Sequence, residues 1–149
     1  MDDFIQVEVD GVFMTSTIHG LTPIVIISNK DGKIMPIYVG VSEGISINSA
    51  LNDEVTPRPM THDLVINIID RMDAKINEVF IDEIKDGIYY ARLSISYNGS
   101  TIEIDARPSD CISLAVRARS PISIRRSVFE YSIIDEDEVE GMMTLDSML

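Results

Sequence analysis

The first forty residues alternate between apolar and polar positions as β-strands do. Apolar side chains alternate with polar ones from Ile5 to Val9, and residues 23–28 form a short run of mostly β-branched side chains. An Asp-Gly turn separates this run from a further apolar segment at residues 34–40. We therefore predict strands in the first 28 residues and a hairpin that returns through residues 34–40.

The next two apolar segments have the spacing of amphipathic helices. In the first, Ser42 and Glu43 open a helix that we expect to continue to Leu51, with the serine capping a backbone N–H. In the second, Thr61 is the expected N-cap. The predicted apolar face of this second helix consists of Leu64, Val65, Ile68, Ile69 and Met72.

A three-stranded meander and a third helix follow. Residues 77–85, 88–97 and 100–106 have strand composition, and the Asp-Gly and Asn-Gly pairs between them favour tight hairpin turns. The third helix is expected from Ser109 to about Arg119, because a proline shortly after that residue disfavours further helix.

The order of these elements predicts an α+β fold, in which a largely antiparallel sheet is covered by about three helices. Residues 121–124 would add a last short strand. Arg-Pro pairs at Arg58 and Arg107 precede two of the helices, which indicates an internal duplication. We divide the chain into a domain at residues 1–129 and an acidic tail at residues 130–149. The tail has no obvious partner strand and is expected to be mobile or a short docking helix.

Composition narrows the class of protein. The 149 residues fit one domain, and no apolar run approaches the roughly 20 residues that a membrane-spanning helix needs. Residues 1–10 lack the basic and apolar regions of a secretory signal. We expect a cytoplasmic protein without membrane contact, in which the single cysteine, Cys111, is buried and structural.

The net charge of −13 disfavours nucleic acid as a partner at long range. The distribution weakens this argument, because 7 of the 25 acidic residues and no basic residue lie at residues 130–149. The remaining 18 acidic and 12 basic residues give residues 1–129 a net charge of −6. Five of the eight arginines lie between Arg107 and Arg126, so a local positive face is compatible with the sequence.

The two Arg-Pro pairs have an architectural and a functional interpretation. In the first, proline ends a strand and directs the chain to a helix N-terminus, where Asp63 and Asp110 act as caps or pair with arginine. In the second, Arg58 and Arg107 are held beside helix N-termini and bind a phosphate.

Four further observations concern chemistry. His62 is the best candidate for a general base, although one histidine in a first helical turn is more often a surface or capping residue. Asp105, at a strand end, is the acidic residue best placed to act beside Arg107. The metal ligands are unknown, and a divalent cation such as Mg²⁺ is the expected cofactor of phosphodiester cleavage. Tyr89 and Tyr90 fit core or subunit packing better than base stacking, and the sheet favours a homo-oligomer.

The segments PRPMTHDL, DGIYYARL and IDARPSDCISLAVR resemble the hallmark motifs of the bifunctional nuclease family, also catalogued as a domain of unknown function. With MPIYVGVSEG upstream, the resemblance covers roughly residues 5–128. The family takes its name from DNase and RNase activity of plant members.

The resemblance implies a nuclease-like protein that hydrolyses phosphodiester bonds in DNA or RNA. Its expected site lies where the two Arg-Pro helix starts meet and consists of Arg58, Arg107, His62, Asp63, Asp105 and Asp110. The alternative is a non-catalytic homo-oligomeric binding module, whose acidic tail docks a basic protein partner.

Overall fold

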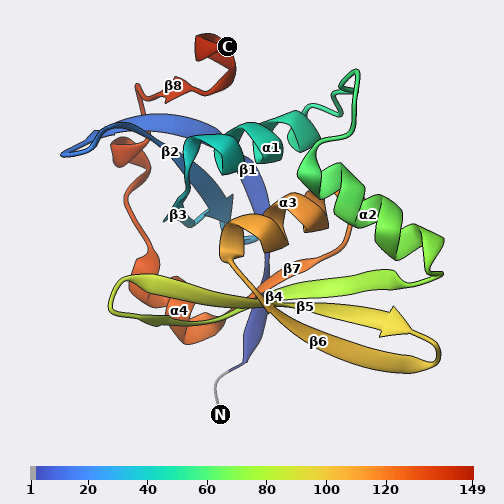
Figure 1. Cartoon of the computed structure of the whole chain (residues 1–149). Helices are drawn as coiled ribbons and strands as arrows, with labels where there is room; N and C mark the ends of the chain where they lie inside the picture. The colour runs from blue at the N-terminus through green and yellow to red at the C-terminus, as the bar shows by residue number, and fades with distance from the viewer. Residues whose placement is uncertain (1–2) are drawn as a thin grey trace.

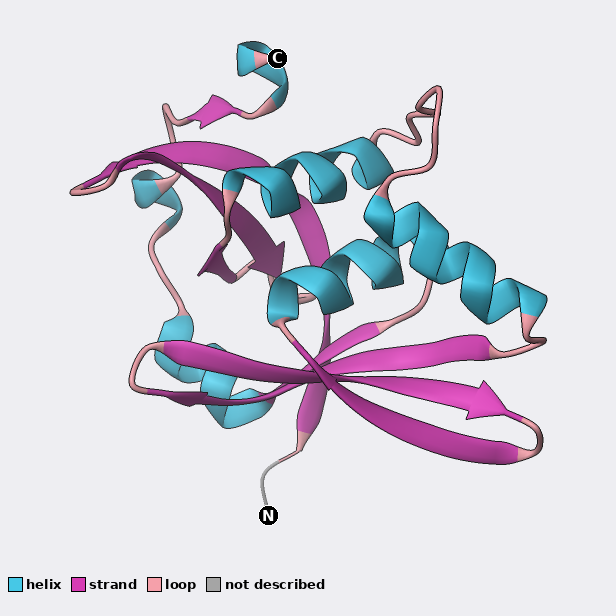
Figure 2. Ribbon diagram, in the orientation of Figure 1, coloured by secondary structure: helices cyan, strands magenta, loops and turns pink. Residues whose placement is uncertain are grey.

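Eight strands form one sheet in the order β3-β2-β1-β7-β4-β5-β6, and β8 pairs with β1 beside this path (Figures 1 and 2). This computed structural model describes residues 3–149. Neighbouring strands are antiparallel, except that β4 and β7 are parallel. The strands are β1 (Phe4–Thr17), β2 (Gly20–Ser28), β3 (Ile34–Tyr38), β4 (Lys75–Lys85), β5 (Ile88–Tyr97), β6 (Ser100–Ala106), β7 (Ile122–Arg125) and β8 (Met143–Thr144).

β1 joins the two halves of the sheet. Its first residues pair with β7, and its longer C-terminal part pairs with β2. The register of the β1–β2 pair shifts between Val9 and Gly11, which marks a bulge. Since a bulge bends and twists the strand that carries it, β1 can belong to both halves.

The α-helices are α1 (Val41–Leu51), α2 (Thr61–Arg71), α3 (Pro108–Ala118) and α4 (Arg126–Ser132). The first three lie together, with α3 packed on α1, α2, β4 and β5 (Figure 1). The short α4, which we did not predict, lies apart from them against β3, β4 and β7. The α+β prediction, with its antiparallel meander, is confirmed.

Each predicted helix begins one residue earlier than expected, at Val41, Thr61 and Pro108. Gly40, Met60 and Arg107 occupy the N-cap positions, so neither Ser42 nor Thr61 is a cap. In α2, Asp63 takes over the capping role by accepting a hydrogen bond from the Met60 backbone N–H at 2.9 Å. In α3, proline suits the first helical position because the backbone N–H that it lacks would have no partner there.

The core lies between the sheet and helices α1 and α3. Its fully buried side chains include Ile47, Ile81 and Ile112, and Phe129 of α4 is buried against the strands that α4 covers. Helix α1 approaches β2 closely at Gly44, where a Cβ would lie 3.0 Å from the Cβ of Pro23. The absence of a side chain at this position therefore permits the contact.

The predicted apolar face of α2 is only partly used. Val65 and Ile69 pack against the core, but no residue of α2 is fully buried. Leu64, Ile68 and Met72 remain about half exposed. Helical spacing identified the apolar residues correctly, but it could not show that the face is wider than the core that it meets.

The acidic C-terminal segment packs against the rest of the chain. Residues of β8 pair with β1, Ile134 bridges to Ile34, and Leu145 is only 3% exposed. Asp146 accepts hydrogen bonds from the side-chain amides of Asn48 and Asn52. The prediction of a tail without a partner strand is therefore wrong, because two residues of strand are too few to produce a readable alternation.

Two composition-based expectations can be compared with the structure. Within residues 3–149, no helix combines the length and apolar character needed to cross a membrane. Cys111 is fully buried on α3, and burial raises the pKa of its thiol to about 12. The prediction of a buried structural cysteine is thus confirmed.

Candidate functional site

The N-termini of α2 and α3 meet through a histidine and an aspartate. His62 lies in the first turn of α2, and its Nε2 is 2.8 Å from Oδ1 of Asp110 in the first turn of α3. The other ring nitrogen, Nδ1, is 2.7 Å from Oγ of Ser46 on α1. Both nitrogens of His62 are therefore engaged, and its side chain is only 13% exposed.

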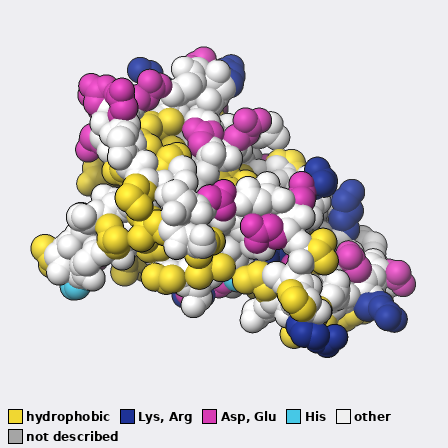
Figure 3. Space-filling model, turned by 90° about the horizontal axis from the view of Figure 1, so that it is seen from above, with side chains coloured by type: hydrophobic (Ala, Val, Ile, Leu, Met, Phe, Trp, Pro, Cys, Tyr) yellow, Lys and Arg dark blue, Asp and Glu magenta, His cyan; other side chains and the backbone are white. Residues whose placement is uncertain are grey.

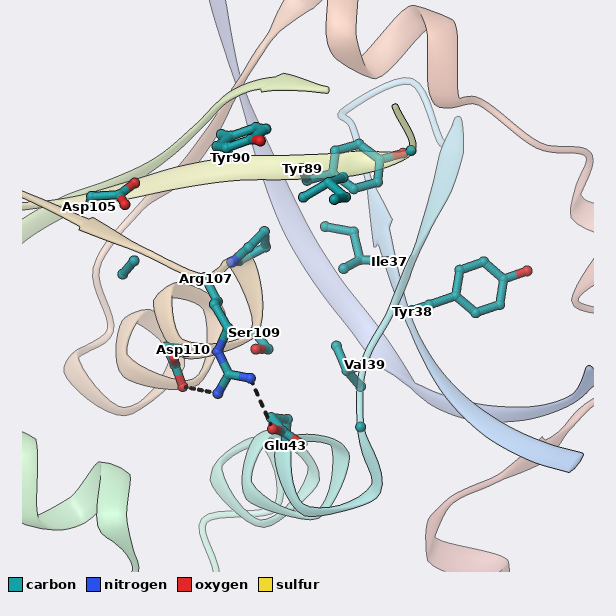
Figure 4. Close-up of a pocket in the computed structure, with 15 residues that line it drawn as sticks. Ile37, Tyr38, Val39, Glu43, Tyr89, Tyr90, Asp105, Arg107, Ser109 and Asp110 are labelled. Atoms are coloured by element: carbon teal, nitrogen blue, oxygen red, sulfur yellow. Dashed lines mark hydrogen bonds and ion pairs between the residues drawn. The ribbon is translucent and has the colours of Figure 1, made fainter. Parts of the chain in front are cut away.

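Asp110 also binds Arg107, which follows β6 and is the N-cap residue of α3. Arg107 Nε donates to Asp110 Oδ2 at 3.1 Å, and Arg107 Nη1 donates to Glu43 Oε1 at 3.3 Å (Figure 4). Burial raises the pKa of the Asp110 carboxyl, but hydrogen bonds from His62 and Arg107 outweigh it, so the pKa lies below its ordinary value. Asp110 is thus an ionised acceptor between two donors.

Asp63 pairs with a residue that is distant in the chain and not with its neighbour His62. Its carboxylate does not pair with His62 but accepts a hydrogen bond from Arg117 Nε on α3 at 2.7 Å. This hydrogen bond holds the pKa of the Asp63 carboxyl below its ordinary value. Asp63 therefore joins α2 to α3 and caps α2.

A cavity of about 770 Å³ opens beside Arg107. Its walls come from the end of β3, the β4–β5 turn, the end of β6 and the first turn of α3 (Figure 4). Apolar and aromatic residues form one part of the lining, including Ile37, Val39, Tyr89 and Tyr90. The charged residues in the lining are Glu43, Asp105, Arg107 and Asp110.

A smaller cavity, of about 280 Å³, adjoins the first one. Ser46 and His62 line it, and Glu43, Arg107 and Asp110 line both cavities. The ion pairs of Arg107 therefore lie between the large cavity, whose lining is partly aromatic, and the small cavity, whose lining residues are mainly polar.

The structure brings together four of the six predicted site residues. His62 and Asp110 are in direct contact, Arg107 contacts Asp110, and Asp105 lines the large cavity with them. Asp105 is exposed and lines the large cavity. Within residues 3–149, its carboxylate has no hydrogen-bond or ion-pair partner.

Arg58 and Asp63 lie outside this group. Arg58 is exposed in the loop before α2, and it lines neither of the two cavities beside Arg107. A role for Arg58 in the site therefore stays a prediction, because the structure places only Arg107 beside these two cavities.

Sequence analysis missed Glu43, Ser46, Ser113 and Arg117. A usable signal was present, because Asp110, Ser113 and Arg117 recur at spacings of three and four on α3. Glu43 and Ser46 have the same spacing on α1. Polar stripes on otherwise apolar helices indicate a polar contact between helices, although a single sequence does not show which stripes meet.

The site residues do not form a ready-made metal centre. Among residues 3–149, no three His, Cys, Asp or Glu side chains are grouped so that they could hold a metal ion.

Comparisons with known proteins agree with the motifs. Residues 25–137 match the family model described as the bifunctional nuclease domain. The chain is 32% identical over 123 residues to an uncharacterized protein of Mycobacterium tuberculosis (strain ATCC 25618 / H37Rv), which covers 80% of this chain and 73% of that protein.

Plant relatives of the chain are named bifunctional nucleases. The chain is 31% identical over 109 residues to Bifunctional nuclease 1 of Oryza sativa subsp. japonica, which covers 70% of this chain and 33% of the rice protein. It is 28% identical over 109 residues to Bifunctional nuclease 1 of Arabidopsis thaliana, which covers 70% of this chain and 34% of that protein. The chain thus spans about a third of the length of these plant proteins.

Proposed function

This chain belongs to the bifunctional nuclease family, and from that membership we propose that it hydrolyses phosphodiester bonds in DNA or RNA. One observation carries the proposal. Asp105, at the end of β6, and Arg107, at the N-cap of α3, line the same cavity of about 770 Å³. A cation that can bind phosphate and a carboxylate that can accept a proton therefore face the same space.

Arg107 is the proposed phosphate ligand. Its side chain is 66% exposed, and its ion pairs with Asp110 and Glu43 lie at the protein surface. Exposed ion pairs contribute only about 0–1 kcal/mol, so a substrate phosphate can compete for the guanidinium. A phosphate that binds two guanidinium nitrogens of Arg107 would lie at the opening of both cavities.

Asp105 is the proposed proton acceptor. Its carboxylate is exposed and unpaired within the described chain, so it is available to a water molecule or a ribose hydroxyl in the cavity. Both ring nitrogens of His62 and both carboxylate oxygens of Asp110 already have hydrogen-bond partners. Their geometry supports a role in orienting Arg107.

Two tyrosines favour unpaired nucleotides as substrates. Tyr89 and Tyr90 line the large cavity, and the Tyr89 hydroxyl donates to Ser132 Oγ at 2.8 Å, which restrains its ring. Stacking of a base on an aromatic ring contributes about 1–3 kcal/mol and requires that the base be unpaired. Acidic side chains are spread over the face shown in Figure 3, which disfavours the many phosphate contacts of duplex binding.

The charge of the cavity bears on the conditions of the reaction. Glu43, Asp105 and Asp110 repel a phosphate that approaches Arg107. A divalent cation carried by the substrate's own phosphates would reduce this repulsion. We therefore propose Mg²⁺ or Mn²⁺ as a counterion that promotes the reaction.

The test is a cleavage assay with labelled single-stranded and duplex DNA and RNA, in Mg²⁺, in Mn²⁺ and in chelator. We expect Asp105→Asn to reduce cleavage by about 10²–10⁴-fold, the usual contribution of acid–base catalysis. The matched control is Asp82→Asn, since Asp82 pairs with Arg92 and does not line the cavity. Equal cleavage by the parent and Asp105→Asn would show that the activity has another source.

A second candidate is a homo-oligomeric binding module without catalysis. It is favoured by the half-exposed apolar residues Leu64, Ile68 and Met72 on α2, and by β6, whose free edge ends the sheet. The exposed acidic residues 135–138 would then attract a basic partner. Absence of both cleavage and oligonucleotide binding at low salt would support this alternative.

A further inference from the structure

Five side chains from α1, α2 and α3 form a continuous chain of hydrogen bonds, which leads from the interior to the walls of the two cavities. Arg117 Nη1 lies 2.6 Å from Ser113 Oγ, which lies 2.9 Å from Ser46 Oγ. Ser46 Oγ lies 2.7 Å from His62 Nδ1, and His62 Nε2 lies 2.8 Å from Asp110 Oδ1. We call these five residues, Arg117, Ser113, Ser46, His62 and Asp110, the relay.

Arg117 limits the directions that these hydrogen bonds can take. A guanidinium can only donate, so Ser113 Oγ accepts from it. The single hydroxyl proton of Ser113 is then free to point at Ser46 Oγ. In this order the hydroxyl proton of Ser46 points at Nδ1 of His62, which offers a lone pair.

Asp110 imposes the same arrangement from the other end of the relay. An ionised carboxylate can only accept, so the neighbouring Nε2 of His62 must carry a proton. A neutral ring with its proton on Nδ1 would instead turn a lone pair toward Asp110. For a neutral ring, Asp110 therefore selects the Nε2–H tautomer of His62, and the donor order that starts at Arg117 is compatible with the same tautomer.

We propose that the relay holds His62 as the Nε2–H tautomer, and that Arg117 and Ser113 thereby act as positioning residues for Asp110 and Arg107. With Oδ1 of Asp110 occupied by His62, Oδ2 remains for Arg107 Nε at 3.1 Å. Arg107 Nη2 also lies 3.5 Å from Asp110 Oδ1, and Nη1 donates to Glu43, so these contacts hold the guanidinium at the opening of the two cavities.

Ser46 belongs to the relay as an orienting group and not as a nucleophile. It is only 3% exposed, and its Oγ is engaged by both Ser113 and His62. The relay is also well enclosed at its origin, since the Arg117 side chain is 9% exposed. Its effect on hydrolysis rests on the proposed function, whereas the tautomer of His62 does not.

The tautomer can be observed directly by long-range ¹H–¹⁵N spectroscopy of ¹⁵N-labelled protein. The chain has two histidines, so His19, which is exposed in the β1–β2 turn, serves as an internal reference for His62. Where the rings are neutral, we expect His62 to show a protonated Nε2 and a bare Nδ1. A proton on Nδ1 would overturn the proposal, whatever the protein hydrolyses.

Ser113→Ala tests the contribution of the relay. Loss of one hydrogen bond should raise the ratio of the Nδ1–H to the Nε2–H tautomer of His62 about fivefold. kcat should fall in proportion to the fraction of rings that leave the Nε2–H form. Ser49→Ala, a buried serine on the same helix as Ser46, should change neither. Ser113→Thr, which keeps the hydroxyl, should restore the parent spectrum.

The two proposals fail in different ways. Unchanged His62 spectra in a folded Ser113→Ala protein, verified by near-UV circular dichroism, would refute the relay even if cleavage continued. Absence of cleavage by the parent, together with the expected His62 spectrum, would refute the proposed function and leave the tautomer established.

Discussion

His62 and Asp110 are 48 positions apart in the chain, yet their side chains meet at 2.8 Å where two helices begin. The contact joins the two Arg-Pro corners through the residues that follow them. Asp110 also binds Arg107, and His62 also binds Ser46. Substitutions at these residues and on the surfaces around them test this arrangement.

Replacing Asp110 with asparagine should release Arg107. The amide lacks the charge that attracts the guanidinium and can offer His62 only a neutral acceptor. We expect cleavage of single strands to fall at least tenfold, with only a small loss of thermal stability. Kinetics beside the Asp82→Asn control would check this, and a parent-like kcat/KM for Asp110→Asn would contradict it.

Substitution of Arg107 by methionine should weaken oligonucleotide binding, because this change removes the proposed phosphate contact. Loss of one contact to a single strand should lower the slope of log K against log salt by about 0.7. Arg58→Met is the matched control, since Arg58 also precedes a proline but lines neither cavity. Fluorescence anisotropy over a range of salt concentrations measures both, and equal losses would refute the assignment.

Asp63 should make stability depend on acidic pH. Its hydrogen bond from Arg117 lowers its folded-state pKa below the 3.8 of the free group. The ionised form is thus favoured by folding, so the contribution is fully present above the unfolded pKa and is lost as pH falls through the folded pKa.

Urea unfolding of the parent and of Asp63→Asn tests this linkage. At neutral pH the substitution should cost about 1 kcal/mol, since the pair is partly exposed. The difference between the two proteins should shrink as the pH is lowered through the acidic range. A difference that does not change with pH would exclude linkage through Asp63.

Cys111 should react with thiol reagents only when the protein opens. The side chain is fully buried, and its pKa is raised to about 12, so little thiolate forms near neutral pH. Labelling with a disulfide reagent should therefore be slow in buffer and accelerate steeply through the urea transition. Rapid labelling of the folded protein would contradict the buried assignment.

The exposed apolar residues of α2 should contribute to any self-association. Ile68→Lys introduces a charge on a side chain that is 49% exposed, so it should spare the fold. If α2 forms an oligomer contact, light scattering after size exclusion should show a lower mass for this variant than for the parent. Ile18→Lys, on a 96% exposed side chain of the β1–β2 turn, is the control.

Local pattern was sufficient where the interactions themselves are local. The Asp86-Gly87 and Asn98-Gly99 pairs predicted the turns of the meander, and all three strands are present. Helical spacing likewise located α1, α2 and α3 to within about one residue at their starts. Hydrogen bonds within a turn or a helix depend on neighbours in the chain, so composition and spacing carry the information.

The sequence by itself determined helices α1, α2 and α3, the three-stranded meander, the α+β class, the burial of Cys111 and the residue types that reach the helix N-termini. Tertiary structure alone decided that His62 pairs with Asp110 and not with Asp63, that Ser46 and Arg117 join them, and that Arg58 lines neither cavity beside Arg107. It also decided that the acidic segment returns to β1. These contacts form between residues far apart in the chain, and their partners are selected by how helices pack, which no local periodicity records.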